Sequence, residues 1–300
     1  KEKAELELLL SSDARLKTLV KKELKASADE YGDERRSALT ERTEAQAFSE
    51  KDLLTAEPVT VVLSDKGWLR AAKGHDIDPT SLNYKAGDKF LSSALGRSNQ
   101  NVFLQDTTGR FYALSAHTLP SARGQGEPAT GRLNPPSGSL FTHLVMGDDS
   151  QKILLGTDAG YGFVAKIGDL FTKNKAGKAV VSIPKGGKIL SPKLVSDENL
   201  LIAAVSNEGR LLAFPLSDLP ELSRGKGNKI INVPSSRLQA REEFVVDFAV
   251  IPEGGSLVVH SGKRYLVMKS KDLEHYRGER GRRGHKLPRG FQKVDRLEAE

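Results

Sequence analysis

Five segments of this sequence combine glycine with lysine or arginine, and this combination suits the binding of phosphate groups. Glycine lets a backbone approach a phosphate closely, and the cationic side chains supply the opposite charge. A single loop of this kind is usually an ordinary solvated turn, whereas several on one rim would form a binding surface. The candidate binding residues are the cations of these loops and of the basic stretch after the last one: Lys85, Arg123, Lys173, Lys175, Lys178, Arg224, Lys226, Lys229, Arg277, Arg280, Arg282, Arg283, Lys286 and Arg289.

The spacing of the loops indicates that they belong to a repeat. Each repeat has a turn that ends in glycine, and a polar–apolar pair such as Asp218-Leu219 follows nine or ten residues later. The turn glycines are Gly67, Gly109, Gly160, Gly209 and Gly262. In the last four repeats a loop glycine follows 17 to 19 residues after the turn glycine, at Gly126, Gly177, Gly227 and Gly281. This spacing predicts that every repeat presents its basic loop on the same rim.

The repeats have the pattern of β-strands. Apolar runs on both sides of a turn glycine, such as 200–205 and 210–214, predict a hairpin. Further strands are expected at 90–95, 140–146, 179–183, 189–195, 230–233 and 244–251. About four strands recur at the spacing of the turn glycines, 42 to 53 residues, which is typical of propeller blades.

The predicted fold class is therefore mainly β, with a five-bladed, propeller-like array over residues 58–300 and an α-helical segment over residues 1–57. We expect an open ring, although the repeats alone do not decide whether it closes. Residues 290–297 would either add a strand to an earlier blade or hang free.

Leucines at helical spacing predict a helix over residues 1–31, ended by Gly32. Ser11, Ser12 and Asp13 either start a second helix or interrupt a single long one. Such leucines normally pack against another helix, and the chain begins as if in the middle of a helix, so we expect a fragment whose partner helix lies upstream. The charged stretch 31–52 has little pattern and is expected to be a linker.

The charge of the chain is unevenly distributed. Residues 1–57 carry 11 Lys/Arg and 14 Asp/Glu, whereas the whole chain of 300 residues has a net charge of +7, so the repeats carry the excess positive charge. Nucleic acid is the natural partner of such a basic region. The chain has no cysteine and no apolar run of transmembrane length, and we expect a cytoplasmic setting without a membrane span.

Several segments resemble the C-terminal domain of the A subunit of bacterial type IIA topoisomerases, and within that family topoisomerase IV in particular. The residues that carry the resemblance are 68–77, 119–127, 223–232 and 278–284. In addition, the N-terminal helix and residues 31–36 are similar to the segment that leaves the cleavage core of that protein. The resemblance covers essentially the whole chain.

The resemblance implies a β-pinwheel, a relative of the propeller in which blades exchange strands, with duplex DNA bent along the basic rim. The family role would be to position the transported DNA segment for ATP-dependent decatenation and supercoil relaxation, so the chain would be part of an isomerase in the nucleoid. The implied partners are double-stranded DNA, a second copy of the same protein and the ATPase B subunit, in an A2B2 complex, and a chromosome-condensation protein. The family's holoenzyme uses ATP and Mg²⁺ in other domains, and no cofactor is expected in this chain.

Gyrase carries a Gln-Arg-Arg-Gly-Gly-Lys-Gly box that supports DNA wrapping, and this chain has no full copy of it. Residues 123–126 and 224–227 are only degenerate echoes. This departure disfavours gyrase-like wrapping, which stays as one alternative. A protein-interaction propeller that lacks DNA contacts is the other alternative, and duplex affinity that falls steeply with salt would separate it from a DNA-binding domain.

No catalytic centre is expected in this chain. The family's catalytic tyrosine follows an arginine, and Arg264-Tyr265 spells that pair, but inside the second strand of the fifth hairpin, where a structural tyrosine is the expected reading. The six histidines show no His-x-x-x-His or carboxylate spacing, so no metal site is expected. Gly177-Lys178-Ala179 lacks the other residues of an ATP-binding phosphate loop.

Overall fold

The structure is a computed structural model that describes residues 2–33, 55–196 and 200–300. The chain divides into two compact units, an N-terminal helical one and a C-terminal β one. The predicted boundary between residues 57 and 58 stays a prediction. Most of the predicted linker, residues 34–52, lies outside the described residues.

Two helices form the N-terminal unit. The helix α1 spans Glu2–Leu10 and α2 spans Asp13–Tyr31, so the break at Ser11–Ser12 separates two helices rather than marking one long one. Ser12 has an extended backbone, and Gly32 ends α2. None of the described residues of either helix is buried, and Leu10 and Leu24 are among the exposed apolar side chains.

Five hairpins form the framework of the β unit. Each of the predicted turn glycines lies between the two strands of a hairpin and has a positive φ, between 59° and 80°, which glycine adopts without strain. The hairpin strands are β1 (Pro58–Ser64) and β2 (Trp68–Lys73), β4 (Asn101–Asp106) and β5 (Arg110–Ser115), β8 (Lys152–Thr157) and β9 (Tyr161–Lys166), β12 (Leu201–Ser206) and β13 (Arg210–Pro215), and β16 (Leu257–Ser261) and β17 (Arg264–Met268). The prediction of five equivalent hairpins is confirmed.

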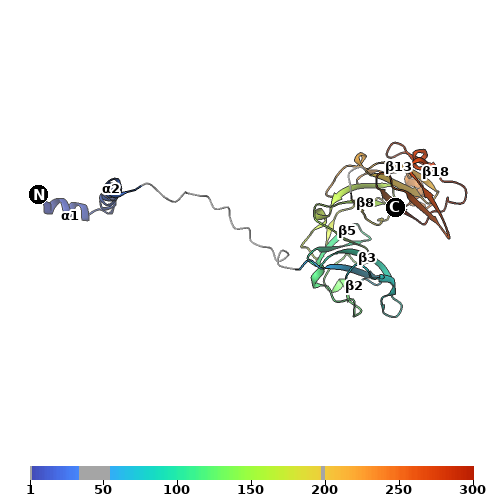
Figure 1. Ribbon diagram of the computed structural model, residues 1–300, viewed down its shortest axis with the longest axis horizontal. Helices are drawn as coiled ribbons and strands as arrows, with labels where there is room; N and C mark the ends of the chain where they lie inside the picture. Colours follow the sequence, from blue (N-terminus) through green and yellow to red (C-terminus); the bar gives the residue numbers. More distant parts are fainter. Residues whose placement is uncertain (1, 34–54, 197–199) are drawn as a thin grey trace. The chain divides into compact units, whose positions relative to one another are not determined.

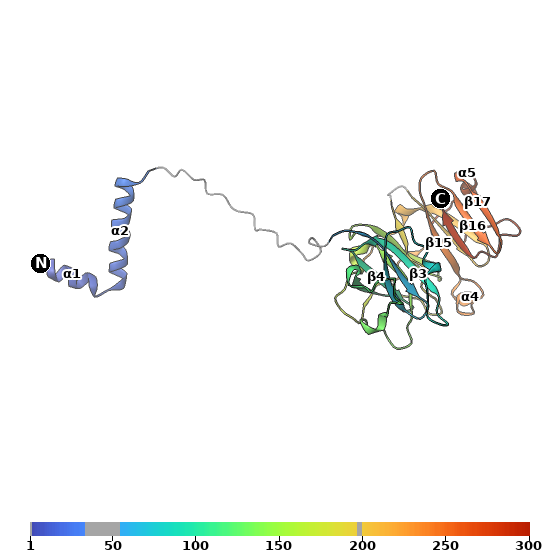
Figure 2. The same cartoon turned by 60° about the horizontal axis from the view of Figure 1, so that its bottom comes forward.

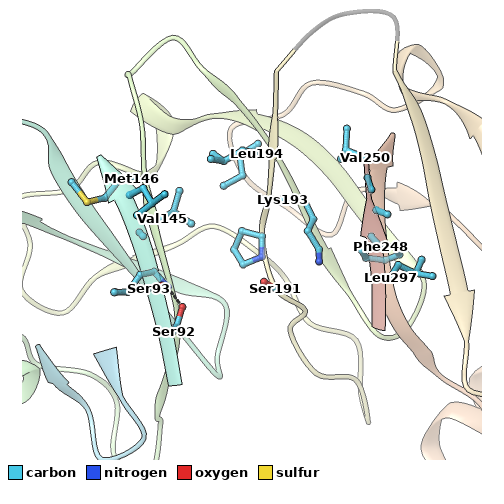
Figure 3. A pocket seen from close by; sticks show the side chains of 17 residues that line it. Ser92, Ser93, Val145, Met146, Ser191, Lys193, Leu194, Phe248, Val250 and Leu297 are labelled. Carbon is cyan, nitrogen blue, oxygen red and sulfur yellow. Dashed lines mark hydrogen bonds between the residues drawn. The ribbon is translucent and has the colours of Figure 1, made fainter. Parts of the chain in front are cut away.

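A third strand flanks the first strand of each hairpin. These strands are β3 (Phe90–Arg97), β7 (Phe141–Met146), β11 (Lys193–Val195), β15 (Val245–Ile251) and β19 (Arg296–Ala299). All five contribute residues to one cavity of about 440 Å³, which Figure 3 shows between Ser92 and Met146 on one side and Val250 and Leu297 on the other. These strands are therefore the innermost of each sheet, and the sheets radiate from the cavity as blades, numbered 1 to 5 along the chain.

The outermost strand of blades 1 to 4 comes from the following repeat. These two-residue strands are β6 (Glu127–Pro128), β10 (Lys178–Ala179), β14 (Asn228–Lys229) and β18 (His285–Lys286), and they pair with β2, β5, β9 and β13 respectively. Each of them follows a basic glycine loop along the chain. The loop of one repeat thus docks on the outer edge of the preceding blade, as the resemblance implied.

Buried side chains join neighbouring blades only. Four apolar clusters connect blades 1–2, 2–3, 3–4 and 4–5. Among the described residues no such cluster connects blade 5 to blade 1, which supports the expected open ring. Figures 1 and 2 show the blades following one another along an arc in the order of the sequence.

Short helices punctuate the repeats. They are η1 (Pro79–Ser81), η2 (Ala116–Thr118), η3 (Ala129–Gly131), η4 (Ile167–Leu170), η5 (Leu216–Asp218), α4 (Ser235–Gln239), α5 (Ser270–Leu273) and η6 (Glu274–Tyr276). The predicted polar–apolar pairs lie at these helices in repeats 2 to 5, where the apolar residue is buried, for example Leu219. In the first repeat the helix instead lies two residues after Asp76-Ile77.

Three strand predictions were wrong. Residues 230–233 are not a strand, because the amides of Ile230 and Ile231 both bond to the carbonyl of Gly160 instead of a ladder. Residues 179–183 and 189–195 contribute only the short strands β10 and β11. Residues 290–297 neither join an earlier blade nor hang free, because β19 pairs with β16 of its own blade, which has three strands.

Candidate nucleic-acid interface

The basic loops lie at the seams between blades, and their glycines are required there. Gly227 has a φ of 73°, and a Cβ at this position would overlap the carbonyl oxygen of Gly162 in the preceding blade. At Gly177 an added Cβ would lie 2.6 Å from the ring of Tyr112. Glycine therefore serves the close approach of the exchanged strand, a structural role that the phosphate argument had not included.

The fifth loop corrects one predicted equivalence. The glycine that precedes the exchanged strand β18 is Gly284, with a φ of 72° and no room for a Cβ beside the carbonyl of Leu211. The predicted equivalent was Gly281, three residues earlier. The fifth repeat is longer at this point because α5 and η6 precede its loop.

Successive loops bond to one another along the outer edge of the blades. Arg70 donates to the carbonyl oxygens of Asn83 (2.8 Å) and Gly124 (3.1 Å), which ties the first loop to the second. The other links are Asn134 to Lys175, Ser182 to Gly225, Gly281 to Ile230 and Asn232 to Arg282, all between backbone atoms at 2.8–2.9 Å. The five loops therefore form one continuous band, which we call the outer rim.

Aromatic side chains hold two lysines of the outer rim. Nζ of Lys226 lies 3.9 Å from the ring centre of Tyr161, and Nζ of Lys85 lies 3.3 Å from that of Trp68. Trp68 and Tyr161 are the first residues of β2 and β9, directly after the turn glycine. Such cation–π contacts orient an exposed ammonium group without neutralising its charge.

Six predicted site residues are exposed, and no ion pair is found for them within residues 55–196 and 200–300. They are Arg123, Lys173, Lys175, Arg224, Lys226 and Arg289. The first five lie on the loops of repeats 2 to 4. These cations keep their full charge towards solvent, so the seams between blades 1 and 4 carry the strongest uncompensated potential of the outer rim.

Carboxylates accompany most cations of the fifth loop. Arg277 pairs with Glu274 at 3.2 Å, Arg282 with Glu279 at 2.8 Å, and Lys286 lies 3.7 Å from Glu208. These pairs are exposed, and each reduces the net positive charge that a phosphate would meet. The fifth loop has the densest run of arginine in the sequence, but the structure makes it the most compensated.

Arg283 has a structural role. Its guanidinium pairs with Glu243 at 2.5 Å, and Glu243, only 1% exposed, also accepts from Arg237 at 2.8 Å. A buried carboxylate needs such partners, because an unpaired one would be strongly destabilising. The Arg283 side chain is therefore committed to the joint between loop 5 and the fourth repeat.

Three further predicted cations bond to the protein itself. Lys178 donates to the carbonyl of Asp169, Lys229 donates to the side chain of Asn232 at 2.9 Å, and Arg280 donates to the carbonyl of Lys229 at 2.8 Å. All three are half-buried. They brace the outer rim and retain their charge, because none of these oxygens belongs to a carboxylate.

The structure adds three arginines that sequence reasoning missed. Arg70 is 3% exposed and stacks on Tyr84, and Arg110 and Arg210 donate to the carbonyls of the loop glycines Gly177 and Gly284. The available signal was their position, one or three residues after a turn glycine, which places them under the incoming loop.

A second cavity, of about 500 Å³, opens on the outer rim at the seam between blades 2 and 3. It lies between β5 and loop 3, and its lining includes Phe171, Lys173 and Lys175. The other seams along β2, β9 and β13 are closed by a parallel bridge between strand and loop, as at Val164 and Glu221. The outer rim is thus notched where two of its uncompensated lysines lie.

Tyr265 lies in β17, as predicted, and its side chain is 67% exposed. We expect no cleavage of DNA at this tyrosine, because a strand position opposite His260 offers no arrangement for activating a phenol beside a bound phosphodiester. Incubation of the chain with supercoiled and nicked duplex, followed by denaturation, should yield no covalent protein–DNA adduct. An adduct that disappears in Tyr265→Phe would contradict this expectation.

The described residues contain no helix that is long and apolar enough to span a membrane. Comparison with known proteins gives a consistent family. A profile described as "DNA gyrase C-terminal domain, beta-propeller" matches residues 151–196 and 201–252, which hold most of the third and fourth repeats.

Two curated relatives are the A subunits of DNA topoisomerase 4 from Pseudomonas aeruginosa, 57% identical over 298 residues, and from Escherichia coli, 49% identical over 300 residues. These alignments cover 99% and 100% of this chain. The chain spans 40% of the length of either relative.

The solved structure of the E. coli ParC C-terminal domain superposes with a TM-score of 0.74 at 49% identity, and it covers 81% of this chain and 99% of that chain. A gyrase A C-terminal domain superposes with a TM-score of 0.59 at 16% identity over 81% of this chain and 83% of that chain, which shows a shared fold. The chain therefore belongs to the family of C-terminal domains of the topoisomerase IV protein ParC.

Proposed function

We propose that the outer rim binds duplex DNA through its phosphates and bends it around the blades. The observation that carries the proposal is the continuous band of bonded loops, which puts Arg123, Lys173, Lys175, Arg224 and Lys226 on successive seams. Blades that radiate from a common cavity place their outer edges on an arc. A duplex that touches several seams must therefore curve.

Phosphate contacts of this kind carry no sequence information. The proposed role in the whole protein is to position a transported duplex by its geometry during ATP-dependent decatenation and supercoil relaxation. The names of the relatives and the resemblance of the sequence support this role, together with assembly as A2B2, a nucleoid setting in the cytoplasm and contact with a chromosome-condensation protein. The site residues Lys85 and Arg289 would extend the path at its two ends.

The test compares two double variants that remove the same charge from different environments. Arg224→Ala with Lys226→Ala removes uncompensated cations and should make the log–log salt slope of duplex affinity shallower by about 1.8, since each phosphate contact contributes about 0.9. Arg277→Ala with Arg282→Ala is the matched control, because Glu274 and Glu279 already compensate these cations. We expect this control to change the slope by less than half as much.

Affinity should be measured by fluorescence anisotropy across a salt series with two duplexes of unrelated sequence. Both duplexes should lose affinity equally. An unchanged slope for the Arg224/Lys226 variant, or a loss confined to one duplex, would remove loop 4 from the DNA path. Energy transfer between dyes at the two duplex ends reports the bend, and ends that come no closer on binding would exclude bending along the outer rim.

A further inference from the structure

The fifth blade has an acceptor edge that its own chain leaves uncovered. In blades 1 to 4 the second hairpin strand pairs with a strand from the following repeat, whereas the fifth sheet has the order β17-β16-β19 and no such strand. Within the described part of the chain, β17 pairs only with β16. Tyr265 and Val267 on this strand are 67% and 42% exposed.

The carbonyl of the turn glycine marks the same vacancy. In blades 1 to 4 this oxygen accepts a backbone N–H from the residue just after the donated strand, as in Ile230 to Gly160 at 2.7 Å and Leu287 to Gly209 at 2.8 Å. No described residue donates to the carbonyl of Gly262. A Cβ built at Gly262 would meet nothing within 4 Å, whereas at Gly160 it would overlap the docked segment.

The four occupied edges define the chemistry of a segment that fits. Each donor has a glycine with a φ between 71° and 85°, then two extended residues, then an apolar residue that is at most 2% exposed. These donors are Gly126 to Ala129, Gly177 to Val180, Gly227 to Ile230 and Gly284 to Leu287. The glycine avoids a clash with the acceptor strand, and the apolar residue anchors the segment below the hairpin turn.

Charge narrows the choice further. Lys263 precedes β17, and Lys269 and Lys271 follow it; all three are exposed, and no ion pair is found for them among the described residues. Exposed lysines at an edge discourage pairing with another basic strand. They would attract a segment whose two extended residues are acidic.

We propose that the outer edge of β17 binds an extended segment of a partner protein with the pattern glycine, two acidic or uncharged residues and an apolar residue. The main-chain bonds of strand addition supply affinity, and the glycine and apolar positions supply specificity. The proposal is independent of DNA binding, because the outer-rim cations Arg123 to Lys226 belong to other blades.

The probe is a ten-residue peptide with the sequence of residues 225–234 in which both lysines are replaced by glutamate. Its isotope-labelled partner is the full 300-residue chain, and the readout is the shift of backbone amide resonances. We expect saturable shifts at residues 262–268. A peptide with valine at the position of Gly227 should bind at least about tenfold more weakly, since the left-handed conformation and the close approach both exclude a side chain.

The variant Tyr265→Asp with Val267→Asp keeps the fold, because both side chains are exposed, and it should abolish the shifts. Three outcomes would overturn the proposal. These are an absence of shifts at β17, equal affinity for the glycine and valine peptides, and shifts at residues 161–164, where the parent sequence docks within this chain. Lysines alone would also attract the valine peptide, so the glycine comparison separates strand addition from non-specific charge attraction.

Discussion

Replacing Gly227 with valine should lower the free energy of unfolding by about 4 kcal/mol or more, because strain at a positive φ adds to a steric overlap that the backbone cannot relieve. The φ of Gly227 is 73°, and a Cβ would overlap the backbone of Gly162 in blade 3. Loss of the donated strand β14 would also expose Ile230 and Ile231, which are buried under the turn of that blade. Denaturant unfolding followed by fluorescence and circular dichroism measures the effect.

Gly254→Val is the matched control. Gly254 has nearly the same φ, 76°, but a Cβ there meets nothing within 4 Å. We expect this variant to lose only the conformational term, about 1–2 kcal/mol. Equal losses for the two variants would mean that strand donation contributes nothing to the stability of the blades.

The stability of the β unit should fall as the pH drops from about 6.5 towards 4 because of His143. Burial, with a smaller effect of Lys193, lowers the pKa of this imidazole to about 4, and its Nδ1 is buried without a hydrogen-bond partner. In the unfolded chain the imidazole regains a pKa near 6.5. The unfolded state therefore takes up a proton in this window and the folded state does not, so stability is full above the window and is lost through it, by about 2–3 kcal/mol.

The measurement is the free energy of unfolding at a series of pH values for the wild type and His143→Gln. The difference between their slopes isolates this side chain from the carboxylates that titrate in the same range. Slopes that coincide between pH 6.5 and about 4.5 would show that the pKa of His143 is the same in the folded and unfolded states. The pair of Lys193 with Asp247, 2.9 Å long, lies beside it at the central cavity and is retained in the variant.

The repeat framework was predictable because it follows from local chemistry. A turn that needs a positive φ selects glycine, so all five hairpin turns could be located from Gly67 to Gly262. The buried leucines of the polar–apolar pairs recur for a similarly local reason. The donated strands could not be located in this way, since two residues such as Asn228 and Lys229 carry no alternating pattern.

The site was only partly readable for an electrostatic reason. Sequence shows how many cations a loop holds but not which carboxylates fold beside it. Arg283 looks like a binding residue in the sequence, but Glu243, 40 positions earlier in the chain, folds against it. Arg123 and Lys175 stay as predicted because their surroundings are open, and only the fold distinguishes the two cases.

Donation of strands from later to earlier repeats fixes an order of events during synthesis. A blade is finished only when the loop of the next repeat has left the ribosome, about 50 residues after its own hairpin, which at bacterial elongation rates of about 5–20 residues per second is a delay of several seconds. Each nascent blade meanwhile exposes the edge that β6, β10, β14 or β18 will cover. A chain truncated between two repeats would keep one such edge permanently, so the unit of independent folding is a repeat together with the loop of its successor.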